Sequence, residues 1–169
     1  MTIRAVWLGL LASLIVSHNA FGQAEDADPA AIVEIGGASQ WGLKGGSSFG
    51  PSVAAEATPI PGVLELEGGV ATLFSRGRTE WDADFLFKKP YTLSNTVEFM
   101  FGVGPQWARV AAHGGTADEL AGEAVLDFMY WPWPSRKYGF YLEPSYDYGF
   151  GRGHDQSLGI SAGLLIPIP

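Results

Sequence analysis

Apolar and polar residues alternate along most of the chain after residue 30. This alternation predicts β-strands with one apolar and one polar face, because successive side chains of a strand point to opposite sides. Glycine- or proline-containing stretches separate the alternating segments. The predicted strands are Ala31–Trp41, Phe49–Ala57, Val63–Phe74, Thr79–Phe87, Thr96–Trp107, Leu120–Trp131, Tyr138–Phe150 and Ser157–Ile168.

The length of these strands points to a membrane. Strands of soluble proteins average about 5–6 residues, whereas a tilted strand needs about 9–11 residues to cross a bilayer. The predicted strands are long enough to do so. An even number of such strands predicts an all-β fold, namely an eight-stranded antiparallel up-and-down transmembrane β-barrel. The predicted turns are Thr58–Gly62, Lys88–Leu93 and Pro132–Arg136, which contain proline, and the glycine-rich or polar Gly42–Ser48, Arg76–Arg78, Val110–Glu119 and Gly151–Gln156.

The apolar face of the strands is expected to contact lipid, with aromatic rings at the two headgroup layers. The predicted lipid face consists of Leu64, Leu66, Val70, Val97, Phe99, Phe101, Leu126, Phe128, Phe140, Leu142, Ile160 and Leu164. The predicted aromatic belts consist of Trp41, Trp81, Trp107 and Tyr148 at one end, and of Tyr130, Trp133 and Tyr138 at the other. The alternative is a soluble periplasmic, lipocalin-like ligand-binding barrel with these rings inside.

The first 24 residues have the pattern of a secretory signal peptide. Arg4 precedes an apolar run over residues 5–16, and Gly22-Gln23-Ala24 provides small residues at a cleavage site. The apolar run is short for the ~20 residues of a membrane-spanning helix. We therefore expect cleavage after Ala24 and a single β-barrel domain over residues 25–169.

Composition narrows the classes of function. The formal net charge of −8 argues against nucleic acid as a partner, because phosphate binding requires clustered lysine and arginine. The chain contains no cysteine, which excludes disulfides, cysteine nucleophiles and iron–sulfur clusters. No cofactor is predicted.

The polar face of the strands is unusually acidic. The predicted acidic cluster of the lumen consists of Glu34, Glu65, Glu67, Asp82, Asp84, Glu98, Glu123, Asp127, Glu143 and Asp147, and Glu56 and Glu80 share this face. Basic residues are expected to lie at strand ends or in loops, so few of them can pair with these acids. Crowded carboxylates must take up protons, bind cations or keep water. Two hypotheses follow: a hydrated polar core, or a lumen that binds or passes cations such as Ca²⁺. The spacing of the acids matches no metal-binding loop, so no metal site is predicted.

A catalytic site is the remaining alternative. His154, Ser157 and either Glu143 or Asp155 could form a Ser–His–acid set. A spacing of three residues at the start of a strand, however, places the first two side chains on opposite faces. We expect a protein that is not an enzyme.

The segment Glu143–His154, followed by Ser157–Leu165, resembles the closing hairpin of small eight-stranded outer-membrane β-barrels of Gram-negative bacteria, in a proteobacterial subgroup. The sequence departs from that group in ending on Pro167-Ile168-Pro169 instead of an aromatic residue. The resemblance implies an outer-membrane location and a structural or interaction role. The apolar face is expected to contact outer-membrane lipid, and an extracellular partner is expected at the loops, Val110–Glu119 above all, because loops vary in sequence and bind partners. A cation-binding or porin-like conducting barrel and a lipid A-modifying enzyme remain alternatives, and the oligomeric state is open.

Overall fold

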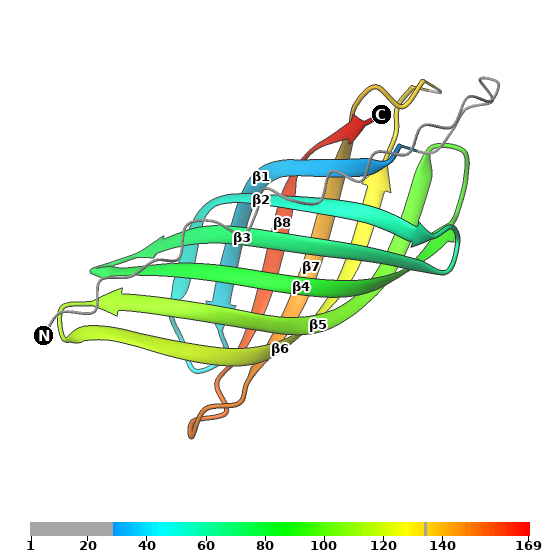
Figure 1. The fold of residues 1–169 in the computed structure, drawn as a ribbon. Coiled ribbons are helices and arrows are strands. Elements are labelled where there is room, and N and C mark those ends of the chain that lie inside the picture. Colours follow the sequence, from blue (N-terminus) through cyan, green and yellow to red (C-terminus); the bar gives the residue numbers. More distant parts are fainter. Residues whose placement is uncertain (1–28, 134) are drawn as a thin grey trace, which may run out of the picture.

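The computed structural model describes residues 29–133 and 135–169, which form a closed barrel of eight antiparallel strands (Figure 1). Each strand pairs with its neighbours in sequence, and β1 pairs with β8 to close the sheet. The strands are β1 (Ala31–Gly42), β2 (Ser47–Ile60), β3 (Leu64–Ser75), β4 (Arg78–Thr92), β5 (Val97–Ala112), β6 (Gly115–Tyr130), β7 (Gly139–Gly149) and β8 (Gln156–Ile168). The predicted fold class is confirmed. The predicted signal peptide, residues 1–24, lies outside the described residues.

The barrel has two unlike ends. β1 begins and β8 ends at one of them, which we call the terminal end; the opposite end, which we call the distal end, carries the β1–β2, β3–β4, β5–β6 and β7–β8 turns (Figure 1). Within the described ranges, the structure contains no helix long and apolar enough to cross a membrane.

The barrel is apolar outside and polar inside. Leu126 and Leu142 point outward and are 42% and 44% exposed, whereas the neighbouring Asp127 and Glu143 are buried in the interior. This inverts the usual soluble pattern, in which apolar side chains fill the interior. The seven aromatic side chains predicted for the belts are all exposed on the outer surface.

Two predicted turns are wrong because the hydrogen-bonded ladders continue through them. Val110–Glu119 was expected to be a long loop, but β5 and β6 pair as far as Ala112 and Gly115, leaving only a tight turn between them. This stretch is rich in small residues, so apolar and polar positions do not alternate clearly enough to indicate a strand. Lys88–Leu93 was likewise expected to be a turn, but β4 pairs with β5 as far as Thr92.

An apolar cluster closes the interior at the terminal end. It consists of the buried side chains of Ile32, Met100, Met129, Trp131, Tyr141 and Leu165. Trp131 follows β6 directly and is 1% exposed, and its backbone N–H donates to the Thr96 carbonyl at 2.8 Å. Its indole N–H donates to Glu98, which also accepts a hydrogen bond from Arg136. The interior at this end is therefore packed.

Close approach of the strands requires glycine at several positions, of which Gly104 on β5 shows the reason most clearly. A Cβ atom added to Gly104 would lie 1.9 Å from the Phe85 carbonyl oxygen of β4. A Cβ atom added to the exposed Gly68 on β3 would meet no atom closer than 4.0 Å. The two positions therefore form a matched pair.

We expect Gly104→Ala to destabilise the barrel by about 1–3 kcal/mol, because the added methyl group forces the β4–β5 ladder apart. Gly68→Ala should leave stability nearly unchanged. Urea unfolding of the folded barrel, followed by tryptophan fluorescence, measures both. Equal losses at the two positions would contradict the β4–β5 register.

Candidate functional site

The centre of the lumen holds one buried ammonium group. Lys88 lies on β4 and points inward, and its side chain is 0% exposed. Its Nζ donates hydrogen bonds to Asp127 Oδ2 at 2.9 Å, to Glu143 Oε2 at 2.6 Å and to Glu67 Oε2. Charge-assisted bonds of this kind are about twice as strong as neutral ones.

Further carboxylates surround the same ammonium group. Glu56 Oε2 lies 3.8 Å from the Lys88 Nζ atom. Glu34, Glu56, Glu67 and Asp127 each offer one carboxylate oxygen, and these four atoms lie within 4.8 Å of one another. We call the five acids around Lys88 the carboxylate cage. Its members come from five strands: Glu34, Glu56, Glu67, Asp127 and Glu143.

Sequence reasoning missed Lys88. The prediction that basic residues avoid the strand interior is wrong at this position, because Lys88 was assigned to a turn together with Lys89 and Pro90. The available signal was its spacing from the acids: Lys88 lies an even number of residues from Asp82 and Asp84 on the same strand, so its side chain points to the same, inward face.

A glycine on the adjacent strand makes room for the lysine. Gly102 pairs with Lys88 across the β4–β5 ladder. A Cβ atom at Gly102 would lie 2.7 Å from Lys88 Cγ. The buried position of the lysine stem therefore depends on the absence of a side chain opposite it.

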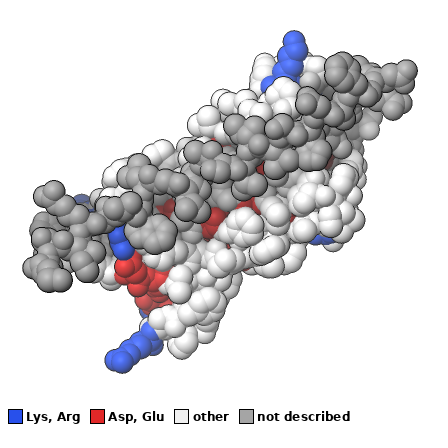
Figure 2. Space-filling model, in the orientation of Figure 1, with Lys and Arg blue, Asp and Glu red and all other residues white. Residues whose placement is uncertain are grey.

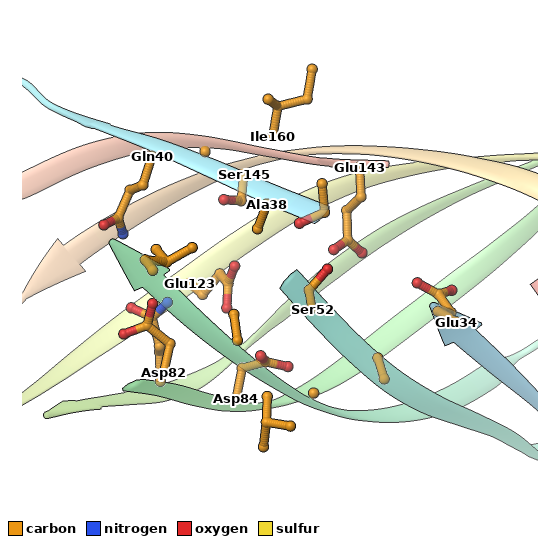
Figure 3. Close-up of a pocket in the computed structure, with 18 of the residues that line it drawn as sticks. Glu34, Ala38, Gln40, Ser52, Asp82, Asp84, Glu123, Glu143, Ser145 and Ile160 are labelled. Atoms are coloured by element: carbon orange, nitrogen blue, oxygen red, sulfur yellow. The ribbon is translucent and has the colours of Figure 1, made fainter. Parts of the chain in front are cut away.

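A small cavity of about 70 Å³ lies beside the cage, toward the distal end. Glu34, Glu123 and Glu143 point into it from three strands (Figure 3). Asp84, Asp147 and Tyr141 also line it. A polar space of this size holds several water molecules, since one water needs about 10–15 Å³ of such volume.

Several buried oxygens around this space lack a hydrogen-bond partner. They are Glu34 Oε1, Ser52 Oγ, both Glu56 oxygens, Asp82 Oδ1, Asp84 Oδ1, Glu123 Oε2, Asp127 Oδ1 and Asp147 Oδ1. A buried polar atom without a partner is costly, so these atoms indicate a need for water, protons or cations.

The distal end opens into a wider funnel of about 770 Å³. Lys44 and Asp155 form an ion pair of 2.7 Å on its rim, and this hydrogen bond lowers the pKa of Asp155 below its usual range. Arg78 pairs with Glu80 at 2.8 Å on the same rim. On the face shown in Figure 2, acidic atoms gather at this opening and basic side chains lie at the extremities.

The structure divides the predicted acidic cluster into groups. Of its ten members, four belong to the cage, four line the cavity on the distal side of the cage, namely Asp82, Asp84, Glu123 and Asp147, and Glu65 lies near the start of β3. Asp147 accepts hydrogen bonds from Gln40 at 3.2 Å and from Ser157 at 2.9 Å. Glu98 lies apart at the terminal end, where it pairs with Arg136 at 2.7 Å.

The residues considered for catalysis are not brought together. Ser157 Oγ donates to Asp147 inside the barrel. His154 is exposed in the β7–β8 turn, where its Nδ1 lies 3.2 Å from the Tyr148 hydroxyl. The two side chains therefore engage different partners on different faces.

Comparison with known proteins supports the fold and leaves the family open. No family model matches the chain, and no curated protein sequence matches it significantly. Neisserial surface protein A aligns with a TM-score of 0.63 and 12% identity, over 82% of this chain and 96% of that chain. The attachment invasion locus protein Ail of Yersinia pestis aligns with a TM-score of 0.52 and 13% identity, over 83% and 100%.

An enzyme shares the same fold. The outer membrane enzyme PagL aligns with a TM-score of 0.53 and 9% identity, over 80% of this chain and 99% of that chain. All three are small outer-membrane β-barrels of Gram-negative bacteria. At these identities the likeness shows the fold alone, and one fold hosts unrelated functions.

We expect Lys88→Met to destabilise the folded barrel by about 3–5 kcal/mol, because it leaves buried carboxylates without their ammonium partner. Lys89→Met on the outer surface is the control and should change stability little. Urea unfolding midpoints measure the difference. Equal midpoints for the two variants would show that the ammonium group does not hold the cage together.

Proposed function

We propose that this chain is an integral outer-membrane protein with a structural or interaction role, its terminal end in the periplasm. The observation that carries the proposal is the inverted polarity of a closed barrel. An apolar outer wall needs lipid around it, whereas the buried charges need a protein wall that shields them from lipid. Closure also leaves the hydrocarbon layer without an open sheet edge.

The packed interior favours this role over conduction. A conducting barrel needs a continuous aqueous path, and eight strands leave an interior that side chains can fill. Here Lys88, Asp127, Leu165 and Trp131 are each at most 1% exposed. Their burial supports a barrel that acts through its surface.

The polar interior also argues against a lipocalin-like carrier. Pockets for apolar ligands are lined mainly by apolar and aromatic side chains. The cavity of this barrel is lined by several acids, among them Glu34, Glu123 and Asp84, beside smaller apolar side chains, and no Phe or Trp lines it. Most of the large apolar side chains, such as Phe101 and Phe128, lie on the outer wall, and the buried ones around Trp131 fill the terminal end.

The distal end is the surface that we propose for an extracellular partner. The β1–β2 and β7–β8 turns carry exposed apolar side chains there, among them Leu43 and Phe150 at 57% and 63% exposure. Loops of this kind vary in sequence and often bind partners, whereas the barrel wall faces lipid. The wall itself, with its aromatic side chains, is proposed to contact outer-membrane lipid.

Fractionation of cells that express the full-length chain tests the location. We expect the protein in the outer membrane, with a gel mobility that shifts on boiling because a folded barrel resists the detergent. Purified protein should give no stepwise currents in a planar bilayer. Recovery in the soluble periplasm would overturn the proposal, and regular current steps would favour the conducting alternative.

A substitution pair on β6 tests contact with lipid. Leu126→Arg should cost about 2–4 kcal/mol of folding free energy, because it places a charge near the middle of the bilayer. Leu120→Arg, closer to the distal end of the same strand, should cost about 0–1 kcal/mol. Urea-dependent folding into lipid vesicles measures both. Equal costs would contradict a lipid-facing wall.

A further inference from the structure

We propose that the carboxylate cage is a binding site for a hard divalent cation, with Ca²⁺ the best fit, held beside Lys88. The site would use Glu34, Glu56, Glu67 and Asp127. One oxygen from each lies within 4.8 Å of the others, which is the spread that a single coordinated ion spans. This proposal does not depend on the role of the barrel surface.

Unpartnered buried oxygens point to the ligand. Glu34 and Glu56 are 1% and 2% exposed. Glu34 Oε1 and both oxygens of Glu56 lack a hydrogen-bond partner, as does Asp127 Oδ1. Glu34 and Asp127 thus each present a buried oxygen without a hydrogen-bond partner among the described residues, whereas Glu56 Oε2 also lies 3.8 Å from Lys88 Nζ.

Lys88 forms its hydrogen bonds with other oxygens, although Glu56 Oε2 lies 3.8 Å from its Nζ atom. Its ammonium group bonds Asp127 through Oδ2, while Oδ1 of the same carboxylate is without a partner. Its other hydrogen bonds go to Glu67 Oε2 and Glu143 Oε2. The ammonium group and a metal ion can therefore share the cage by dividing the carboxylate oxygens between them.

Charge balance requires a second cation or its equivalent in protons. Five carboxylates surround one ammonium group, so a fully ionised cage carries a large negative charge in a buried place. Removing such charge from water is costly unless it is compensated. A divalent ion compensates two of these charges at once.

The ligand chemistry selects the class of ion. All the ligand atoms are carboxylate oxygens, which suit hard cations and not the softer transition metals. Ca²⁺ accepts 6–8 oxygens in flexible geometry, and the adjoining cavity supplies room for water ligands. Glu34 and Glu67 line that cavity, so an ion would enter from the distal funnel.

Terbium luminescence provides the test, because Tb³⁺ replaces Ca²⁺ and is excited by a nearby tyrosine. Tyr141 lines the same cavity as Glu34 and Glu67. The purified barrel, folded in detergent, should show saturable Tb³⁺ luminescence that Ca²⁺ displaces. Ca²⁺ should also raise the unfolding midpoint, since a ligand of the folded state stabilises it. Absence of both effects would overturn the proposal.

Three variants locate the site. Glu34→Gln should weaken Ca²⁺ binding by about tenfold or more. Glu98→Gln, at the terminal end, is the matched control and should leave binding unchanged. Lys88→Met should tighten binding by about tenfold, because it removes a competing positive charge.

The outcomes remain separable from folding defects. A boiling-dependent mobility shift shows which variants fold, and the Ca²⁺ effect on the unfolding midpoint of the unaltered chain needs no variant. Equal loss of binding in Glu34→Gln and Glu98→Gln would overturn the assignment. So would weaker binding in a folded Lys88→Met barrel.

Discussion

The ion cluster around Lys88 is the contact on which the arrangement of the interior depends. A barrel with an apolar wall must place its polar side chains inside, and here most of the polar side chains are acids. A single ammonium group on β4 draws in carboxylates from β3, β6 and β7, and Glu56 of β2 lies beside them. The lysine therefore connects β4 not only with its neighbour β3 but also with β2, β6 and β7, with which β4 shares no ladder. It turns a ring of mutually repelling groups into a cross-link through the middle of the barrel.

The rest of the lumen is ordered along the axis around this cluster. Trp131 and its apolar neighbours fill the terminal end, where Arg136 and Glu98 complete the seal. Toward the distal end, the small cavity and then the funnel bring increasing contact with solvent. Among the described residues, the interior is therefore packed at the terminal end and hollow toward the distal end.

The strands, and which of their side chains point inward, were predictable because successive side chains alternate between the two faces of a strand. Where large apolar residues occupy the outer face, this alternation appears in the sequence as a period of two. It did not reveal Lys88, since two lysines followed by a proline resemble a turn. It also missed the parts of β5 and β6 near the distal end, where alanine and glycine give little difference in hydrophobicity between the two faces. Which acids meet was beyond sequence reasoning, because the stagger of eight strands decides which inward residues share a level. Glu98 shows the point: it has the inward parity but lies apart from the cage, at the terminal end.

The length of the β5–β6 hairpin bears on whether other strands can pair with this protein. β6 begins at Gly115, yet its ladder with β7 begins only at Ala121. The Leu120 carbonyl accepts a hydrogen bond from the Phe150 N–H at 2.9 Å, but the rest of this stretch has no ladder partner on the β7 side among the described residues. Such an edge can template the addition of a foreign strand. Asp118 and Glu119 occupy this short stretch, and Asp118 is held in place by Arg109 across the hairpin. Adjacent negative charges and brevity are the devices that keep exposed edges from joining one another. The sequence of the projecting hairpin thus disfavours edge-to-edge pairing.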